Sequence, residues 1–169
     1  MNIVNFTATE FSELASWFTS EKDVVQWGGP ELTFPLDEKQ MAAMLAEGNG
    51  TSPDRWLFSG VQQGNIVSHA QVALDWRHGV ARLGRVAVNP QWRGKRIAAV
   101  FLRNIIKKVF AEPEFIRLEL SVYTFNQGAI NIYRKLGFRE EGVRRSSVRV
   151  GNERWDTAIY AILRSELPK

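Results

Sequence analysis

The chain has 169 residues, of which 44% are hydrophobic, and its 22 Lys and Arg against 18 Asp and Glu give a formal net charge of +4. This length and apolar content suit a single globular domain over residues 1–169. The absence of cysteine excludes a disulfide framework, a thiol nucleophile and a Cys-bound metal. No apolar run approaches the about 20 residues that cross a bilayer, and a signal-peptide pattern is missing, so we expect a cytoplasmic protein with no membrane association.

The charge is distributed unevenly along the chain. Residues 1–80 carry 4 Lys and Arg and 10 Asp and Glu, a net of −6, whereas residues 81–169 carry 18 and 8, a net of +10. An ordinary solvated surface explains such a division about as well as a functional one. The functional interpretation is a C-terminal half that binds an anion and an N-terminal half that faces a cation.

The first half of the chain mixes helical and strand patterns. A loop at Trp27–Pro30 separates two predicted helices, the first capped by Thr9, and a turn at Gly64–Asn65 joins two strands as a hairpin. The predicted elements are a strand over 2–6, helices over 9–20 and 37–47, and strands over 55–63, 65–75 and 79–88.

The second half contains the clearest helix. Its apolar side chains recur every three or four residues, at Ala98, Phe101, Leu102, Ile105, Ile106 and Val109. The predicted elements are helices over 94–110 and 126–136 and strands over 117–122, 142–150 and 154–163. The order β-α-α-β-β-β-α-β-α-β-β predicts an α/β (α+β) fold with a mixed sheet covered by helices.

Basic residues gather at the junction of a strand and this helix, in the stretch "VAVNPQWRGKRIAAVFL" from Val86 to Leu102. A helix N-terminus presents unpaired backbone N–H groups and attracts anions, and a glycine lets a ligand approach the backbone closely. The stretch matches neither the P-loop nor the Rossmann glycine pattern. It therefore indicates a phosphate or pyrophosphate site of another kind, although a plain connection between two elements explains it as well.

The same stretch resembles the acyl-CoA-binding segment of the GNAT superfamily of N-acetyltransferases. The family pattern Gln/Arg-x-x-Gly-x-Gly/Ala falls on Gln91 and Gly94, and its last small residue falls on Arg96, which is a departure. A later block resembles the family's Asn-x-x-Ala-x-x-x-Tyr and Lys-x-Gly-Phe, at Asn126, Ala129, Tyr133, Lys135, Gly137 and Phe138. The ending "GNERWDTAIYAI" is similar to the branch with ribosomal-protein, polyamine and small-amine acetyltransferases.

This resemblance covers about Gly84 to Ile162 and implies a single domain with an acceptor-side half (about 1–80) and an acyl-CoA-binding half (about 81–169). It implies that acetyl-CoA is the cosubstrate, with its pantetheine arm along Val86, Ala87 and Val88 and with Asn126 near the pantetheine or nucleotide. It implies a pyrophosphate site on the backbone of Arg93, Gly94, Lys95, Arg96, Ile97 and Ala98.

The implied reaction moves an acetyl group to a primary amine of a small molecule or a protein N-terminus. Tyr133 is the expected acid that protonates the departing thiolate. Glu119 is the nearest carboxylate for a general base, and a structural ion pair with an arginine explains it as well. His69 and Asp75, acting through a water, are another option, and water with no dedicated residue ranks first. We expect Trp27, Glu31 and Phe34 to bind the acceptor, with Trp56 and Asp54 as further candidates.

Two other classes of protein stay open. One is a non-catalytic acyl-CoA sensor of the same fold. The resemblance implies a carboxylate in the strand before the CoA loop of many relatives, where this chain has Arg82 and Arg85, and this difference together with Arg96 permits such a sensor. The other is a basic nucleic-acid-binding domain, which is less favoured because the aromatic residues are not interleaved with basic ones. His69 and His78 lack a metal-ligand spacing, so we expect no metal. A homodimer is compatible with the sequence, which does not specify the oligomeric state.

Overall fold

The computed structural model describes residues 1–168. The strands are β1 (Asn2–Asn5), β2 (Arg55–Gln62), β3 (Asn65–Asp75), β4 (Val80–Val88), β5 (Arg117–Tyr123), β6 (Arg139–Val150) and β7 (Glu153–Leu163). The helices are α1 (Phe11–Ser16), α2 (Glu21–Gly28), α3 (Glu38–Ala46), α4 (Ile97–Ala111) and α5 (Gln127–Lys135), with short 3-10 turns η1 (Ala8–Glu10), η2 (Pro90–Trp92) and η3 (Arg164–Glu166). Among these residues no helix is both long and apolar enough to cross a membrane.

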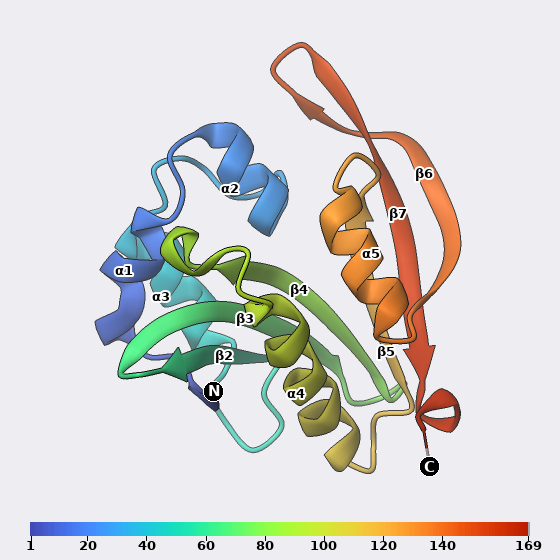
Figure 1. The fold of residues 1–169 in the computed structure, drawn as a ribbon. Coiled ribbons are helices and arrows are strands. Elements are labelled where there is room, and N and C mark those ends of the chain that lie inside the picture. Colours follow the sequence, from blue (N-terminus) through green and yellow to red (C-terminus); the bar gives the residue numbers. More distant parts are fainter. Residues whose placement is uncertain (169) are drawn as a thin grey trace.

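The strands form one sheet in the order β1-β2-β3-β4-β5-β7-β6 (Figure 1). Every neighbouring pair is antiparallel except β4 and β5, which run parallel. A parallel pair needs a crossover connection, and α4 supplies it. The predicted α/β fold with a mixed sheet is confirmed.

Helices pack on both faces of the sheet. Adjacent residues of a strand point to opposite faces, so Phe58 of β2 joins the core under α4 and α5, whereas Leu57 joins a second core with α1 and α3. Phe101 and Ile105 of α4 are fully buried in the first core. Figure 1 shows α4 and α5 on the same side of the sheet.

The N-terminal region differs from the sequence prediction. The capping box at Thr7 starts the 3-10 turn η1, and helix α1 follows it only from Phe11 to Ser16, so the predicted helix over 9–20, capped by Thr9, is shorter than expected. A further helix, α2, follows, and the sequence did not predict it because eight residues are too few for a clear period. Its start is capped by Ser20, whose Oγ accepts the Asp23 N–H at 3.2 Å. As a result Trp27 belongs to a helix, and α2 packs against β4.

Strands β4 and β5 separate part-way along their length. They pair only from Val80↔Arg117 to Leu83↔Leu120, although both continue beyond that point. Near the separation β4 carries a bulge, because His69 of β3 pairs with Ala87 while Gln71 pairs with Gly84. Within the bulge Arg85 has a φ of 51°. The separation leaves one edge of β4 unpaired, and the candidate site is built there.

Candidate active site

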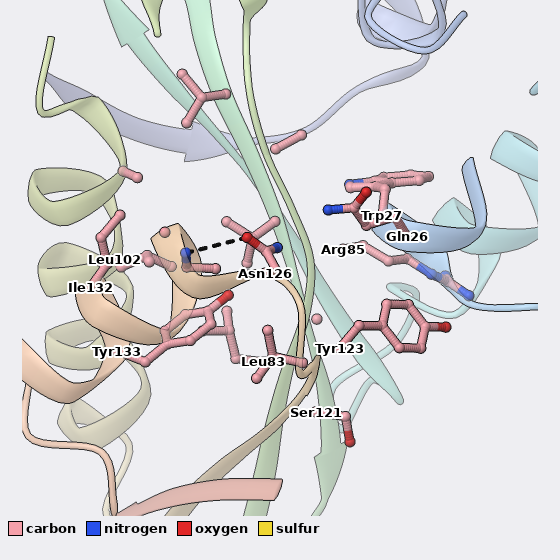
Figure 2. Close-up of a pocket in the computed structure, with 18 of the residues that line it drawn as sticks. Gln26, Trp27, Leu83, Arg85, Leu102, Ser121, Tyr123, Asn126, Ile132 and Tyr133 are labelled. Atoms are coloured by element: carbon pink, nitrogen blue, oxygen red, sulfur yellow. Dashed lines mark hydrogen bonds between the residues drawn. The ribbon is translucent and has the colours of Figure 1, made fainter. Parts of the chain in front are cut away.

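A cavity of about 1300 Å³ opens where β4 and β5 separate. It is lined mainly by the ends of both strands, the start of α4, one face of α5 and the end of α2 (Figure 2), with a few residues of β2, β3, β6 and β7. The lining includes most residues of the predicted CoA segment, namely Val86, Ala87, Val88, Arg93, Gly94, Arg96, Ile97, Ala98 and Asn126. Tyr133 and Trp27 also line it, so the fold brings residues from distant parts of the sequence to one space.

The edge of β4 in this cavity is free to bind an extended ligand. On its other edge β4 pairs with β3 as far as Ser68↔Val88, and the Asn89 N–H donates to Val67 O at 2.9 Å. Facing β5, the pairing stops at Leu83. The backbone groups of Val86–Val88 on that side can therefore hydrogen-bond to an added strand-like chain.

The start of α4 forms an open helix end at the same cavity. Its N-cap, Arg96, has a left-handed backbone (φ 60°) and makes no side-chain capping hydrogen bond. Gly94 has a φ of 76°, and a β-carbon added there would meet nothing within 4 Å. Lys95 does not line the cavity, and its ammonium lies 4.7 Å from the centroid of the Trp92 ring. The helix end thus offers unpaired N–H groups in an accessible, positively charged loop.

Helix α5 supplies the two polar groups on the opposite wall. Asn126 caps the helix, its Oδ1 accepting the Ala129 N–H at 3.3 Å (Figure 2). Tyr133 lies two turns later, and its ring packs edge-on against Phe138. Burial raises the pKa of Tyr133 to about 12. The hydroxyl therefore keeps its proton throughout the neutral and moderately alkaline range.

Residues 14–138 match the acetyltransferase (GNAT) family. The chain belongs to this family. Its relatives include an uncharacterized N-acetyltransferase, YokL, of Bacillus subtilis, 25% identical over 88% of this chain and 84% of the relative. The [ribosomal protein bS18]-alanine N-acetyltransferase of Escherichia coli is 30% identical over 76% of this chain and 81% of the relative.

The fold agrees with the family assignment. The solved spermidine N-acetyltransferase of Vibrio cholerae, in complex with CoA and spermine, superposes with a TM-score of 0.82 at 15% identity, covering 98% of this chain and 96% of that one. The GNAT resemblance seen in the sequence is thus confirmed. The protein is an acetyl-CoA-dependent N-acetyltransferase, as that resemblance implied.

Of the three predicted acceptor residues, only Trp27 lines the cavity of this GNAT domain. It packs against Phe18 and is 8% exposed. Glu31 and Phe34 lie beyond the end of α2 and outside the lining. Their loop runs toward α3 instead, where the Thr33 N–H donates to Gln40 Oε1 at 2.9 Å. Asp54 and Trp56 are also outside the lining.

Glu119 forms a structural ion pair, which the sequence had left open as the alternative to a general base. Its carboxylate accepts hydrogen bonds from Arg82 Nε at 2.9 Å and from Arg117 Nε at 2.8 Å, and it does not line the cavity. Partial burial alone would raise the pKa of Glu119, but the two arginines outweigh burial and lower it. A carboxylate so stabilised in its charged form is a poor proton acceptor.

We expect Glu119→Gln to retain turnover within about threefold, whereas loss of a general base costs about 100- to 10,000-fold. The variant should lower the free energy of unfolding by about 1 kcal/mol in urea denaturation at neutral pH. The pKa of Glu119 is lower in the folded protein than in the unfolded chain. The ion pairs of Glu119 therefore add stability at pH values above the unfolded pKa, and this stability is lost as the pH falls through the folded pKa. A large loss of turnover at unchanged stability would return Glu119 to the role of base.

The two other candidates for a base are also outside the cavity lining. His69 is completely buried, and desolvation together with the charge of Arg85 lowers its pKa to about 3. It is therefore neutral at pH 7, with Nε2 3.1 Å from Gln71 Nε2. Asp75 is exposed at the β3–β4 turn and hydrogen-bonds to His78 at 3.0 Å.

The cavity contains residues that sequence analysis did not assign to it. Gln26 enters from α2, Tyr123 from the end of β5, and Arg85 from the bulge of β4 (Figure 2). From the sequence, Arg85 was noted only as one of two arginines in the strand before the CoA loop. No local pattern reveals a bulge or the separation of two strands, so nothing in the sequence indicated where this side chain points.

Proposed function

We propose that this N-acetyltransferase acts on a primary amine, of a small molecule or of a protein N-terminus, that enters the cavity beside α2 and β4. The observation that carries the proposal is the convergence on one cavity of the open β4 edge, the uncapped start of α4 and the Tyr133 side chain. The relatives support an amine acceptor, because they are named for a ribosomal-protein alanine and for spermidine.

The residues present fit acetyl-CoA. The accessible loop at Gly94 and the N–H groups of Ile97 and Ala98 suit a pyrophosphate, which carries negative charge and accepts several hydrogen bonds. The unpaired edge of Val86–Val88 suits the amides of the pantetheine arm. Bound acetyl-CoA would supply a thioester, whose acetyl carbon forms a bond to the amine nitrogen as its bond to sulfur breaks.

Tyr133 is the proton donor in this proposal. Its pKa of about 12 keeps the hydroxyl protonated, so it can give a proton to a departing thiolate and recover one from solvent. Backbone N–H groups near Val88 would polarise the acetyl carbonyl. Both groups line the same cavity.

Water serves as the proton acceptor for the amine. Within the described residues 1–168, no Asp, Glu or His lines the cavity. The acceptor ammonium therefore loses its proton to solvent, either before it binds or through a water in the cavity. A dedicated base is not needed for an amine that ionises near neutral pH, as an α-amino group does.

The sensor alternative rests on Arg96 at the position of a small residue. The structure accommodates this arginine, because its side chain is exposed and its backbone simply adopts the left-handed conformation. A cytoplasmic location and a homodimer stay sequence-based predictions, and light scattering tests the second of them.

The decisive test is the release of free CoA thiol from acetyl-CoA across amino acids, polyamines, aminoglycosides and N-terminal peptides. We expect thiol release with at least one class of amine, together with an acetylated product detected by mass spectrometry. CoA binding without release for any amine would support the sensor instead. Binding of nucleic acid that resists competitor at moderate salt would favour the third class.

A further inference from the structure

The charged side chains that line the cavity all carry the same sign. Within residues 1–168 the lining contains no Asp or Glu, and its cations are Arg55, Arg82, Arg85, Arg93, Arg96, Arg103, Lys135 and Arg144. Three of them belong to the loop before α4 and to α4 itself, where the pyrophosphate of CoA would lie. The other cations line the rest of the cavity. An acceptor with several positive charges would therefore meet only like charges there among the described residues.

Arg85 differs from the neighbouring arginines on β2 and β4 because it has no carboxylate partner. Arg55 pairs with Glu47, and Arg82 pairs with Glu119. None of the ion pairs found among residues 1–168 involves Arg85. Its Nη1 donates instead to the neutral side chain of Gln71, at 2.9 Å from Oε1.

The surroundings of Arg85 disfavour its charge yet leave it protonated. Burial and the nearby Arg55 lower the pKa of Arg85 to about 10, and Glu47 offsets part of this effect from a distance. A partly buried guanidinium without a counter-ion is under-compensated electrostatically, and an anion bound beside it restores the balance. Its planar fork matches a carboxylate in two parallel hydrogen bonds.

The bulge of β4 places this guanidinium at the acceptor end of the cavity. Its Nε would lie 3.8 Å from a β-carbon built on Gly28, so the side chain reaches α2. Figure 2 shows Arg85 on the same side of the strands as Trp27 and Tyr123, and Tyr133 on the opposite side. The indole N–H of Trp27, on the neighbouring helix α2, is buried without a hydrogen-bond partner in the described chain.

We propose that Arg85 binds a carboxylate that the acceptor carries next to its amine, so that the acceptor is a free α-amino acid. This proposal rests on the proposed function. Arg85 directly precedes the Val86–Val88 edge, and successive residues of a strand advance only about 3.3 Å. An anion on Arg85 and an amine at the thioester therefore fit within one small molecule. The aromatic rings of Trp27 and Tyr123 are suited to an apolar side chain on it.

The same contact assists deprotonation in a cavity without a base. In a free amino acid the negative carboxylate stabilises the protonated form of the adjacent amine. Pairing of this carboxylate with Arg85 cancels that effect. A fixed positive charge near the amine further favours its neutral form. Arg85 thus acts as a specificity-determining and positioning residue.

The experiment compares L-α-amino acids with their amides, which keep the amine and lose the carboxylate. We expect the parent enzyme to prefer the acids at least about 10-fold in kcat/KM and to acetylate spermidine and N-terminal peptides poorly. Arg85→Gln should abolish the preference, chiefly through KM, and Arg85→Glu should reverse it. Arg77→Gln is the matched control. It removes the same charge from an exposed turn residue that lies outside the cavity lining.

A second measurement does not depend on turnover. Calorimetric titration of N-acetyl-L-amino acids and their amides into the CoA-loaded protein should show tighter binding of the acids, lost in Arg85→Gln, with CoA affinity preserved. Equal affinity for acids and amides, or a preference that survives in Arg85→Gln, overturns the proposal. Thiol release with amides or spermidine alone would overturn it too, while leaving the proposed function intact. Absence of thiol release with every amine contradicts the proposed function instead.

Discussion

We expect Tyr133→Phe to lower kcat about 100-fold while leaving the dissociation constant for CoA unchanged. The substitution removes only the hydroxyl, and the ring still packs on Phe138. General acid catalysis accelerates a reaction by about 100- to 10,000-fold. Water can replace the lost donor in part, so we expect a decrease in kcat at the lower end of this range. Steady-state thiol release and calorimetric titration with CoA measure the two quantities separately.

The pH profile gives an independent check on this assignment. Because the pKa of Tyr133 is about 12, kcat of the parent should rise with pH as the amine deprotonates and should not decline below about pH 10. Tyr160→Phe is the matched control, since its hydroxyl bonds to Glu140 and lies outside the cavity lining. Equal kcat in Tyr133→Phe and the parent would remove the proton-donor role.

The second large effect concerns the loop before α4. Gly94→Asp should weaken CoA binding at least about 10-fold, or about 1.4 kcal/mol, because it sets a negative charge beside the proposed pyrophosphate site. Gly94→Asn is the control, since both residues tolerate the left-handed conformation that Gly94 adopts at φ 76° and only one is charged. Calorimetry at low and high salt should show the difference shrinking with ionic strength.

Arg93→Ala, which removes a cation from the same loop, should weaken CoA binding in the same direction. If Asp and Asn at position 94 bind CoA equally well, the anion does not lie at this helix end. The pyrophosphate assignment would then be wrong, even if the protein acetylates amines.

The regular elements of the second half could be predicted because their signals are local. Side chains on one face of α4 repeat at helical spacing, and Asn126 is followed by an apolar helical pattern that ends at Gly137. Each such signal depends on residues within a few positions, which is why the ends of α4 and α5 were predicted to within a few residues. Short α2 lacked enough turns for such a signal.

The environment of the acidic residues could not be predicted in the same way. Glu119 is a candidate base or an ion-pair partner from its sequence alone, and the choice depends on Arg82, which is 37 positions away in the chain. Only the parallel pairing of β4 with β5 brings the two together. Similarly, Glu31 follows Trp27 closely in the sequence, but the end of α2 turns it away from the cavity.

The sequence by itself determined the family, the order of most elements and the segment that suits CoA, because these depend on motifs and periods of contiguous residues. The tertiary structure alone decided which side chains face the acceptor. The bulge in β4 lies where the two strands have separated, and Arg85 has no carboxylate partner there, whereas the paired part of β4 and β5 places Arg82 beside Glu119. Side-chain direction and charge pairing follow strand register, and register is a property of the assembled sheet.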